Sequence, residues 1–122
     1  MATVEAAAEK FTNLYYEYVD KMRHKLGKLY HPEGVLVWNG NESIGAEKIQ
    51  KFFEDLPVSD HKIVSLDCQS VGSGAVLETT ILITTSGYVT LKSKKYPFQQ
   101  SFVITAQDDK WKIASDCVRF QN

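Results

Sequence analysis

The spacing of apolar residues changes near the middle of the chain from a helical period to a strand period. In the first part, Phe11, Leu14, Tyr15, Tyr18 and Met22 recur at steps of three and four residues. Such spacing places side chains on one side of a helix, so we expect a first amphipathic helix within residues 2–26.

Three further elements are expected before the period changes. Residues 23–30 predict a short helical segment that ends before Pro32. The sequence VLVWNGNESIG predicts a β-hairpin, because Asn39-Gly40 is a residue pair preferred in two-residue turns. Residues 45–56 predict a third helix, which ends at Pro57. The apolar side of this helix would consist of Ile49, Phe52, Phe53 and Leu56.

Beyond Pro57 the chain alternates with a period of two. Four β-rich runs follow one another, HKIVSLDCQSV, AVLETTILITTSGYVTL, FQQSFVITAQ and WKIASDCVRF, and the turn sequences GSG, KSKKYP and QDDK separate them. Helices first and a meander afterwards predict an α+β fold, with one curved antiparallel sheet and three helices packed on one face. At 122 residues the chain is expected to form a single domain, residues 1–122.

One face of this sheet is left without a helical cover, because three helices cover only one side. In the runs 98–106 and 111–120, both sets of alternate residues mix apolar and polar side chains. Such a mixture suits a protein interface better than bulk water. We therefore interpret the uncovered face as a protein-binding surface.

The composition excludes several kinds of partner. The net charge is −1, so no overall field attracts nucleic acid or an anionic membrane, and any work on RNA is expected to go through a partner. The N-terminal residues do not have the pattern of a secretory signal, and no run approaches the ~18 apolar residues of a membrane span.

Cys68 and Cys117 lie in apolar strand-like runs, which predicts buried free thiols in a reducing compartment. The glycosylation acceptor Asn41-Glu42-Ser43 is therefore expected to stay unused.

An enzymatic function remains an alternative. An α+β domain with a cavity between helices and sheet can also be an enzyme, for example a small isomerase, dehydratase or hydrolase. A catalytic carboxylate would be Asp67 or Asp116, with Tyr15 or Tyr16 as hydrogen-bond donor. Strand aspartates and tyrosines on an apolar helix stripe more often have structural roles, so we do not expect an enzyme.

Other chemistry is not indicated. We expect His24, His31 and His61 to lie in or beside loops without a carboxylate partner. Two cysteines about fifty residues apart do not form a zinc motif, and the phosphate-binding and nucleophile motifs of common enzymes are missing. We therefore expect neither a metal nor a cofactor.

Several motifs resemble the nuclear transport factor two-like superfamily, and within it the NTF2-related export proteins. They are NLYYEYVD, LGKLY, LVWNG, IQKFFEDLP, FVITAQ and WKIASDCVRFQ, which together span nearly the whole chain. The resemblance implies a cone-shaped fold whose free sheet face pairs with a homologous domain of the large messenger-RNA export receptor. It also implies a non-enzymatic subunit that stabilises the receptor, meets RNA only indirectly, and supports binding of FG-repeat nucleoporins through the heterodimer. A location in the nucleus and at the nuclear pore, with shuttling to the cytoplasm, follows from the same resemblance.

The resemblance also points to site residues. Arg119 in DCVRF matches the family arginine that pairs with an aspartate of the large subunit, and two copies of it would repel each other in a homodimer. The partner face is expected to centre on Cys117, Arg119, Gln100 and Phe102, with Thr84 on a neighbouring strand. The register of the strand that carries Gln100 and Phe102 stays open by one residue.

The related homodimeric factor that carries Ran-GDP is a second alternative. In that factor, acidic residues follow the hairpin tryptophan and fill the loop before the phenylalanine-bearing strand. Here Asn39 follows Trp38, and the loop contains Lys92, Lys94 and Lys95. Charge complementarity with a basic partner is lost or reversed, so we do not expect Ran-GDP binding.

Overall fold

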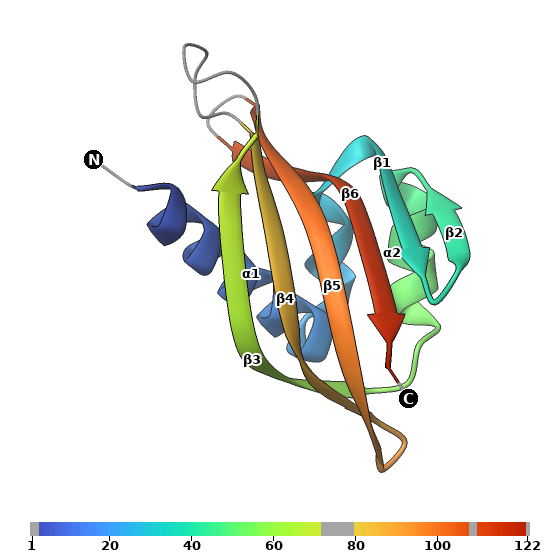
Figure 1. Cartoon of the computed structure of the whole chain (residues 1–122). Helices are drawn as coiled ribbons and strands as arrows, with labels where there is room; N and C mark the ends of the chain where they lie inside the picture. The colour runs from blue at the N-terminus through green and yellow to red at the C-terminus, as the bar shows by residue number, and fades with distance from the viewer. Residues whose placement is uncertain (1–2, 72–79, 108–109, 122) are drawn as a thin grey trace.

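A computed structural model describes residues 3–71, 80–107 and 110–121. It consists of one curved six-stranded sheet with three helical segments on one face (Figure 1). The helices are α1 (Val4–Lys21), the 3₁₀ helix η1 (Arg23–Leu29) and α2 (Ala46–Glu54). The strands are β1 (Tyr30–Trp38), β2 (Asn41–Ile44), β3 (Ser59–Ser70), β4 (Thr80–Leu91), β5 (Lys94–Gln107) and β6 (Lys110–Phe120). None of the described helices has the length and apolar character of a membrane span.

The expected fold class is confirmed, with one difference in strand direction. The strand order is β2-β1-β6-β5-β4-β3, and all neighbours are antiparallel except β1 and β6, which are parallel. Local hairpin signals could not reveal this pair, because about seventy residues separate Trp38 from Lys110. The register shifts at three places, between Tyr30 and Val35, Ile63 and Ser65, and Val103 and Ile104. Such irregularities bend strands and increase twist, and they accompany the curvature of this sheet.

The buried side of α1 is rotated from the expected stripe. Thr3 caps the helix, since its Oγ1 accepts from the Ala6 N–H at 3.0 Å. Leu14 is 37% exposed, and Tyr18 and Met22 are only half-buried. The side chains that pack inward are Ala8, Phe11, Thr12, Tyr15, Tyr16 and Val19. The prediction was wrong at Leu14, because the side of α1 that packs inward passes through Thr12 and Tyr16 and leaves Leu14 at its margin.

The hairpin tryptophan packs where β1 meets α2 and the end of β6. Trp38 is 7% exposed, and its ring centroid lies 5.6 Å from Phe52, 5.7 Å from Phe53 and 5.6 Å from Phe120. Asn39 and Gly40 take φ values of 48° and 86°, which the two-residue hairpin turn requires. The predicted hairpin is confirmed, since β1 and β2 pair antiparallel on either side of this turn.

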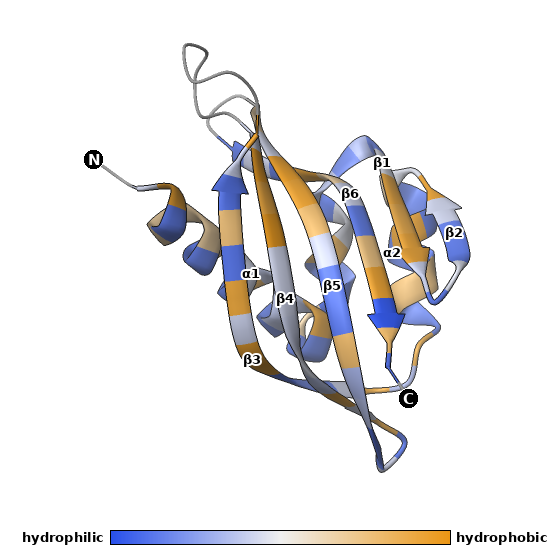
Figure 2. Ribbon diagram, viewed as in Figure 1, coloured by the Kyte–Doolittle hydropathy of each residue, from blue (hydrophilic) through white to orange (hydrophobic). Residues whose placement is uncertain are grey.

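The core lies between the helices and the sheet. Its largest fully buried side chains are Tyr15, Tyr30, Phe53, Phe98, Phe102, Leu26, Leu36, Ile49, Ile81, Ile83, Ile104 and Ile113. Along β3, half-buried and exposed side chains alternate, and Figure 2 shows the matching alternation of hydropathy. The β4–β5 turn consists of Lys92 and Ser93. The predicted turn KSKKYP was too long, because residues 94–97 pair with β4 and begin β5. The predicted turns at GSG and QDDK, and the first part of the run AVLETT, involve residues outside the described ranges.

Candidate protein-binding face

The uncovered face of the sheet is made of three rows of side chains that cross neighbouring strands. Strand register places Asp67, Thr84, Ser101, Cys117 and Val37 in one row. A second row consists of Ser65, Ser86, Gln99 and Arg119. A third row consists of Gln69, Leu82, Val103, Ser115 and Val35. We call these fourteen residues the open face.

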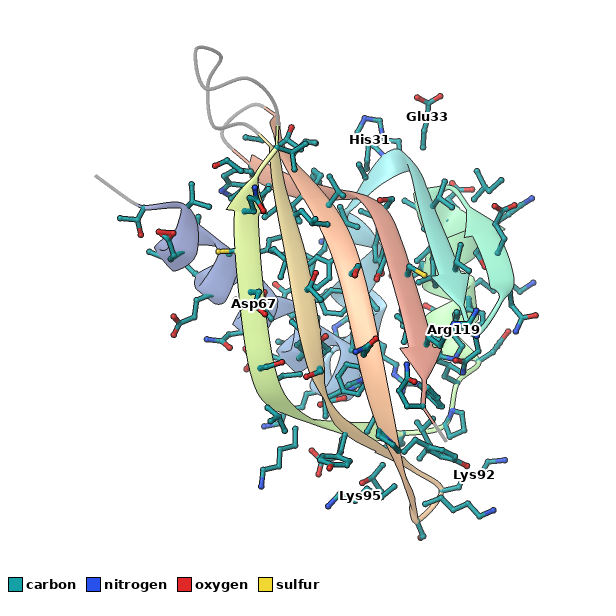
Figure 3. All side chains as sticks on the ribbon, in the orientation of Figure 1. His31, Glu33, Asp67, Lys92, Lys95 and Arg119 are labelled. Carbon is teal, nitrogen blue, oxygen red and sulfur yellow. The ribbon has the colours of Figure 1, made fainter. Side chains whose placement is uncertain are left out.

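Three of the five predicted partner residues lie on the open face. Thr84, Cys117 and Arg119 are all exposed. Thr84 and Cys117 share one row, in which Ser101 separates them, and Arg119 lies in the adjacent row on the same strand as Cys117. Figure 3 shows Arg119 near the end of β6, and Asp67 far from it on β3.

The other two predicted residues point to the opposite side of the sheet. Gln100 is 2% exposed and Phe102 is fully buried, and both face the helices. Their placement on the open face was wrong by one position, because side chains alternate along a strand and a one-residue shift exchanges the two faces. Gln99, Ser101 and Val103 occupy the open face of β5 instead. Both sets of alternate residues are mixed, so the hydropathy of this strand alone could not distinguish them.

Arg119 is held by the hairpin turn described above. The Asn39 N–H donates to the Val118 carbonyl at 2.8 Å, and the Asn39 Oδ1 accepts from the Phe120 N–H at 2.7 Å. These two bonds fix the backbone on both sides of Arg119. Within the described residues, Arg119 forms no salt bridge. Asp67 lies three strands away, about 14 Å across the sheet, which is too far for direct pairing within the chain.

The chemistry of the open face is that of a mixed interface. Its polar side chains are mostly small or neutral, and Leu82 at 38% exposure adds an exposed apolar group beside three valines. Tyr88, at 41% exposure, extends this surface along β4. The whole uncovered side of the sheet is larger than these three rows: five strands at ~4.8 Å spacing and the twelve residues of β4 at ~3.4 Å give it an area of about 800–1,000 Å². One partner contributes about 800 Å² to a standard protein–protein interface.

The candidate catalytic carboxylate Asp116 belongs to a closed polar network inside the cone. It is 2% exposed and accepts from Tyr30 Oη at 2.6 Å, from Tyr15 Oη at 2.9 Å and from Gln100 Nε2 at 2.7 Å. The network continues where Tyr16 Oη donates to Gln100 Oε1 at 2.5 Å. Burial raises the pKa of Asp116, and the hydrogen bonds from Tyr30, Gln100 and Tyr15 oppose this rise.

The alternative candidate carboxylate, Asp67, does not belong to this network. Asp67 lies exposed on the edge strand β3, on the other side of the sheet from Asp116. Burial raises the pKa of Tyr15 and of Tyr30 well above the ordinary value, and the charge of Asp116 raises them further, so both phenols stay protonated donors. The described residues contain no cluster of His, Cys, Asp and Glu side chains that could hold a metal ion.

One histidine does have a carboxylate partner, contrary to the expectation. His61 Nδ1 lies 2.7 Å from Asp20 Oδ1, and the backbone N–H of His61 donates to Asp20 Oδ2 at 2.8 Å. Ser59 Oγ donates to the same carboxylate at 2.7 Å. Burial alone would raise the pKa of Asp20, but the hydrogen bonds and charge of His61, with Ser59, lower it below its usual value. The expectation failed because Asp20 and His61 are 41 positions apart in the sequence, and local patterns do not show that α1 packs against β3.

The two thiols are free, but they are not both buried. Cys68 is half-buried on the core side of β3, and burial raises its pKa. Cys117 is exposed in the middle of the open face, so the expected burial is wrong for this residue.

Comparison with known proteins agrees with this architecture. The model of the nuclear transport factor 2 (NTF2) domain matches residues 7–120. NTF2-related export protein 2 of Mus musculus is 48% identical over 122 aligned residues, which cover 95% of this chain and 86% of the mouse protein. The structure of the yeast UBP3-associated protein BRE5 superimposes with a TM-score of 0.86 at 25% identity, covering 100% of this chain and 99% of that chain.

A structure of a two-protein complex shares the fold. The Candida albicans Mtr2–Mex67 M domain complex contains a chain that superimposes with a TM-score of 0.76 at 16% identity, covering 93% of each chain. At this identity the likeness concerns the fold alone. The match over residues 7–120 and the 48% identity are decisive for the family. The chain belongs to the NTF2 domain family, among the NTF2-related export proteins.

Proposed function

We propose that this protein is a non-enzymatic adaptor that forms a heterodimer with a large messenger-RNA export receptor through the open face. The observation that carries the proposal is an exposed arginine, without a described carboxylate partner, on an uncovered sheet face of interface size. The name of its relatives, NTF2-related export protein, supports an export role. The Mtr2–Mex67 M domain complex supports pairing with a second protein as the mode of action.

Arg119 would be the anchor of this heterodimer. A guanidinium binds a carboxylate through two parallel hydrogen bonds, which gives both strength and orientation. Once the partner covers the open face, the pair is buried, and removal of either member leaves an uncompensated charge at a cost of roughly 3–5 kcal/mol. Thr84 and Cys117 would contact the partner from the adjacent row, together with the apolar group formed by Val37, Leu82 and Val103.

The adaptor would act by stabilising the receptor and by supporting its contact with FG-repeat nucleoporins. The small net charge of −1 favours indirect contact with RNA through the receptor. The corresponding location is the nucleus and the nuclear pore, with passage to the cytoplasm.

The interior network supports the non-enzymatic part of the proposal. A catalytic carboxylate must reach a substrate, but Asp116 is 2% exposed and has hydrogen-bond donors on both oxygens. Its partners come from α1, β1 and β5, so the network ties the helix to the sheet. This arrangement suits a stabilising role.

The test is co-purification of this chain with a candidate receptor subunit after co-expression, followed by sizing of the complex. Arg119→Glu places a carboxylate against the partner carboxylate and should weaken pairing by a factor of roughly 100 or more. Lys51→Glu is the matched control, because Lys51 is an exposed cation on α2, away from the open face. It should leave co-purification unchanged.

Two outcomes would contradict the proposal. If Arg119→Glu co-purifies as well as the unchanged chain, Arg119 is not the anchor. If the lone chain is a stable homodimer whose assembly Arg119→Glu abolishes, the open face pairs with a second copy rather than with a receptor. Circular dichroism of the variant, which should match that of the original chain, separates either result from unfolding.

A further inference from the structure

A second candidate binding site lies on the helix side of the sheet, away from the open face. A pocket of about 630 Å³ opens between the N-terminal half of α1, the end of η1 and the start of β6. Its apolar wall is formed by Phe11, Leu14, Leu29, Trp111 and the small side chains of Ala6 and Ala7. This volume lies in the range of ordinary ligand pockets.

The pocket contains two large apolar side chains that are only partly buried in the core. Leu14 is 37% exposed on an otherwise well-packed helix, and Trp111 is only half-buried on the core side of β6. Phe11 and Leu29, at 5% and 8% exposure, close the bottom of the pocket. An apolar surface of this kind is stabilised when a partner covers it.

The rim of the pocket is cationic. Lys10 from α1, Lys28 from η1, and Lys110 and Lys112 from β6 line it. None of the four forms a salt bridge within the described residues. Lys112 Nζ donates to the Lys28 carbonyl at 2.5 Å, which holds one ammonium at the rim and links η1 to β6. The lysines come from three elements, so positive charge surrounds the apolar wall.

We infer that this pocket binds an acidic peptide segment in which one or two bulky apolar side chains are flanked by Asp or Glu residues. An apolar anchor would enter between Leu14 and Trp111, and the flanking carboxylates would meet the lysines. A fatty acid carries one carboxylate and would engage only part of this rim, whereas a peptide with several carboxylates matches its spread over three elements. The inference is independent of the proposed heterodimer, because the pocket and the open face lie on opposite sides of the sheet.

The test uses the full chain and three fluorescein-labelled 15-residue peptides. The first has a central Phe and Leu flanked by four Asp or Glu residues. The second has the acids replaced by Asn and Gln, and the third has the Phe and Leu replaced by Ala. Anisotropy at two salt concentrations gives affinity, and the indole N–H signals of the two tryptophans in a ¹H–¹⁵N spectrum report position. Trp38 is the internal control, since it pairs with Val118, seven residues or about 23 Å along β6 from Trp111.

The first peptide should bind, shift the Trp111 signal and leave Trp38 unchanged, and its affinity should fall at the higher salt concentration. The double variant Lys10→Glu/Lys110→Glu should weaken its binding about tenfold, since each exposed ion pair contributes modestly. The charge-matched control Lys48→Glu/Lys51→Glu on α2 should bind normally. Leu14→Asp should abolish binding by placing a carboxylate beside the anchor. The second and third peptides should bind more weakly than the first.

Several results would overturn the inference. Equal binding of the first and second peptides would remove the role of the lysines. Binding that shifts Trp38 but not Trp111 would place the site elsewhere, and absence of binding of the first peptide would exclude this class of occupant. If sodium oleate shifts Trp111 while the first peptide does not, the pocket accepts a lipid chain and the peptide assignment is wrong.

Discussion

Asp116 offers a quantitative test of what holds the cone together, because two substitutions at this position separate its charge from its hydrogen bonds. Asp116→Ala removes the acceptor of three donors, the hydroxyls of Tyr15 and Tyr30 and the Nε2 group of Gln100. Asp116→Asn keeps the shape and removes only the charge. We expect the alanine variant to be strongly destabilised, and the asparagine variant to be close to the original chain.

The magnitude for alanine follows from what the three donors find instead. Tyr15 and Tyr30 hydroxyls lie 3.2 Å apart, and Gln100 Nε2 lies 3.0 Å from Tyr15 Oη. The Tyr30 hydroxyl can therefore turn to Tyr15 Oη, which already accepts from one N–H of Gln100. The Gln100 N–H that donated to Asp116 and the Tyr15 hydroxyl proton have no acceptor left among the atoms that contact them. Two buried donors without an acceptor cost about 1–3 kcal/mol each, and one hydrogen bond to a charged acceptor, at about 1.5–3 kcal/mol, is exchanged for a weaker neutral one. Relief of the buried charge offsets part of this loss, so the net cost is roughly 2–5 kcal/mol.

For asparagine, the network has an alternative arrangement. If Oδ1 of the new amide accepts from both tyrosines, its NH₂ group faces Gln100, which must then turn its own amide so that Oε1 accepts. Gln100 Nε2 would next donate to Tyr16 Oη, and Tyr16 would donate to Thr85 Oγ1, 2.7 Å away. Every group keeps a partner and no charge is buried, so we expect a change within about 1 kcal/mol at neutral pH.

Urea unfolding at pH 5 and pH 7 measures both variants. With a slope of about 1.5–2 kcal/mol/M, the alanine variant should lose at least about 1 M in midpoint, whereas the asparagine variant should stay within about 0.5 M. Burial raises the folded-state pKa of Asp116, so its contribution to stability is largest below the unfolded pKa and is lost as pH rises through the folded pKa. The asparagine variant should lack this component. Equal midpoints for the alanine variant and the original chain would refute the network as a source of stability.

Two further predictions concern other parts of the fold. The pKa of Asp20 is lowered, so its pairing with His61 stabilises the protein above the unfolded pKa of an aspartate, and this contribution disappears as pH falls through the folded pKa. Asp20→Asn should therefore flatten the acid limb of a plot of unfolding free energy against pH, and an unchanged limb would contradict the assignment. Gly87→Ala should destabilise by more than about 2 kcal/mol, because its Cβ would lie 2.0 Å from the Lys62 carbonyl oxygen where the β3–β4 register shifts. Thermal unfolding is measured beside Gly40→Ala, whose Cβ meets nothing within 4 Å but whose φ is positive. Gly87 has no positive φ, so its loss of stability reports the clash, and that of Gly40→Ala reports backbone strain without a clash.

The elements of this fold were predictable because each has a local cause. Asn39-Gly40 requires a tight turn, Pro57 ends a helix, and the change from helical to strand spacing marks where the sheet begins. The parallel pairing of β1 with β6 and the rotation of α1 about its axis depend on contacts between distant residues. Neither could be predicted from the spacing of apolar side chains. This spacing shows that a helix has one side that packs inward, but it identifies the residues on that side only to within one or two positions.

The errors at Gln100 and Phe102 have a related cause. In most half-exposed strands, polar side chains mark the solvent face, but β5 places a glutamine in the core and a valine on the open face. Gln100 is buried because its amide can donate to Asp116 and accept from Tyr16 at once. Those partners come from β6 and α1, so a reading of β5 alone cannot identify the buried amide. On the strands that carry Thr84, Cys117 and Arg119, both sets of alternate residues are mixed as well. There the set that faces outward was predicted correctly.

The alternation that misled the prediction also links the interior to the proposed interface. Asp116 in the core network lies between Ser115 and Cys117 on the open face, and Gln100 lies between Gln99 and Ser101. A change of register that exposed Gln100 would leave Asp116 without one of its donors, at the cost of a buried unsatisfied group. The buried network therefore fixes the register of β5 against β6, and this register decides which residues stand beside Arg119. On this reasoning, Asp116→Ala should weaken pairing with a receptor even though Asp116 cannot touch it, and Asp116→Asn should not.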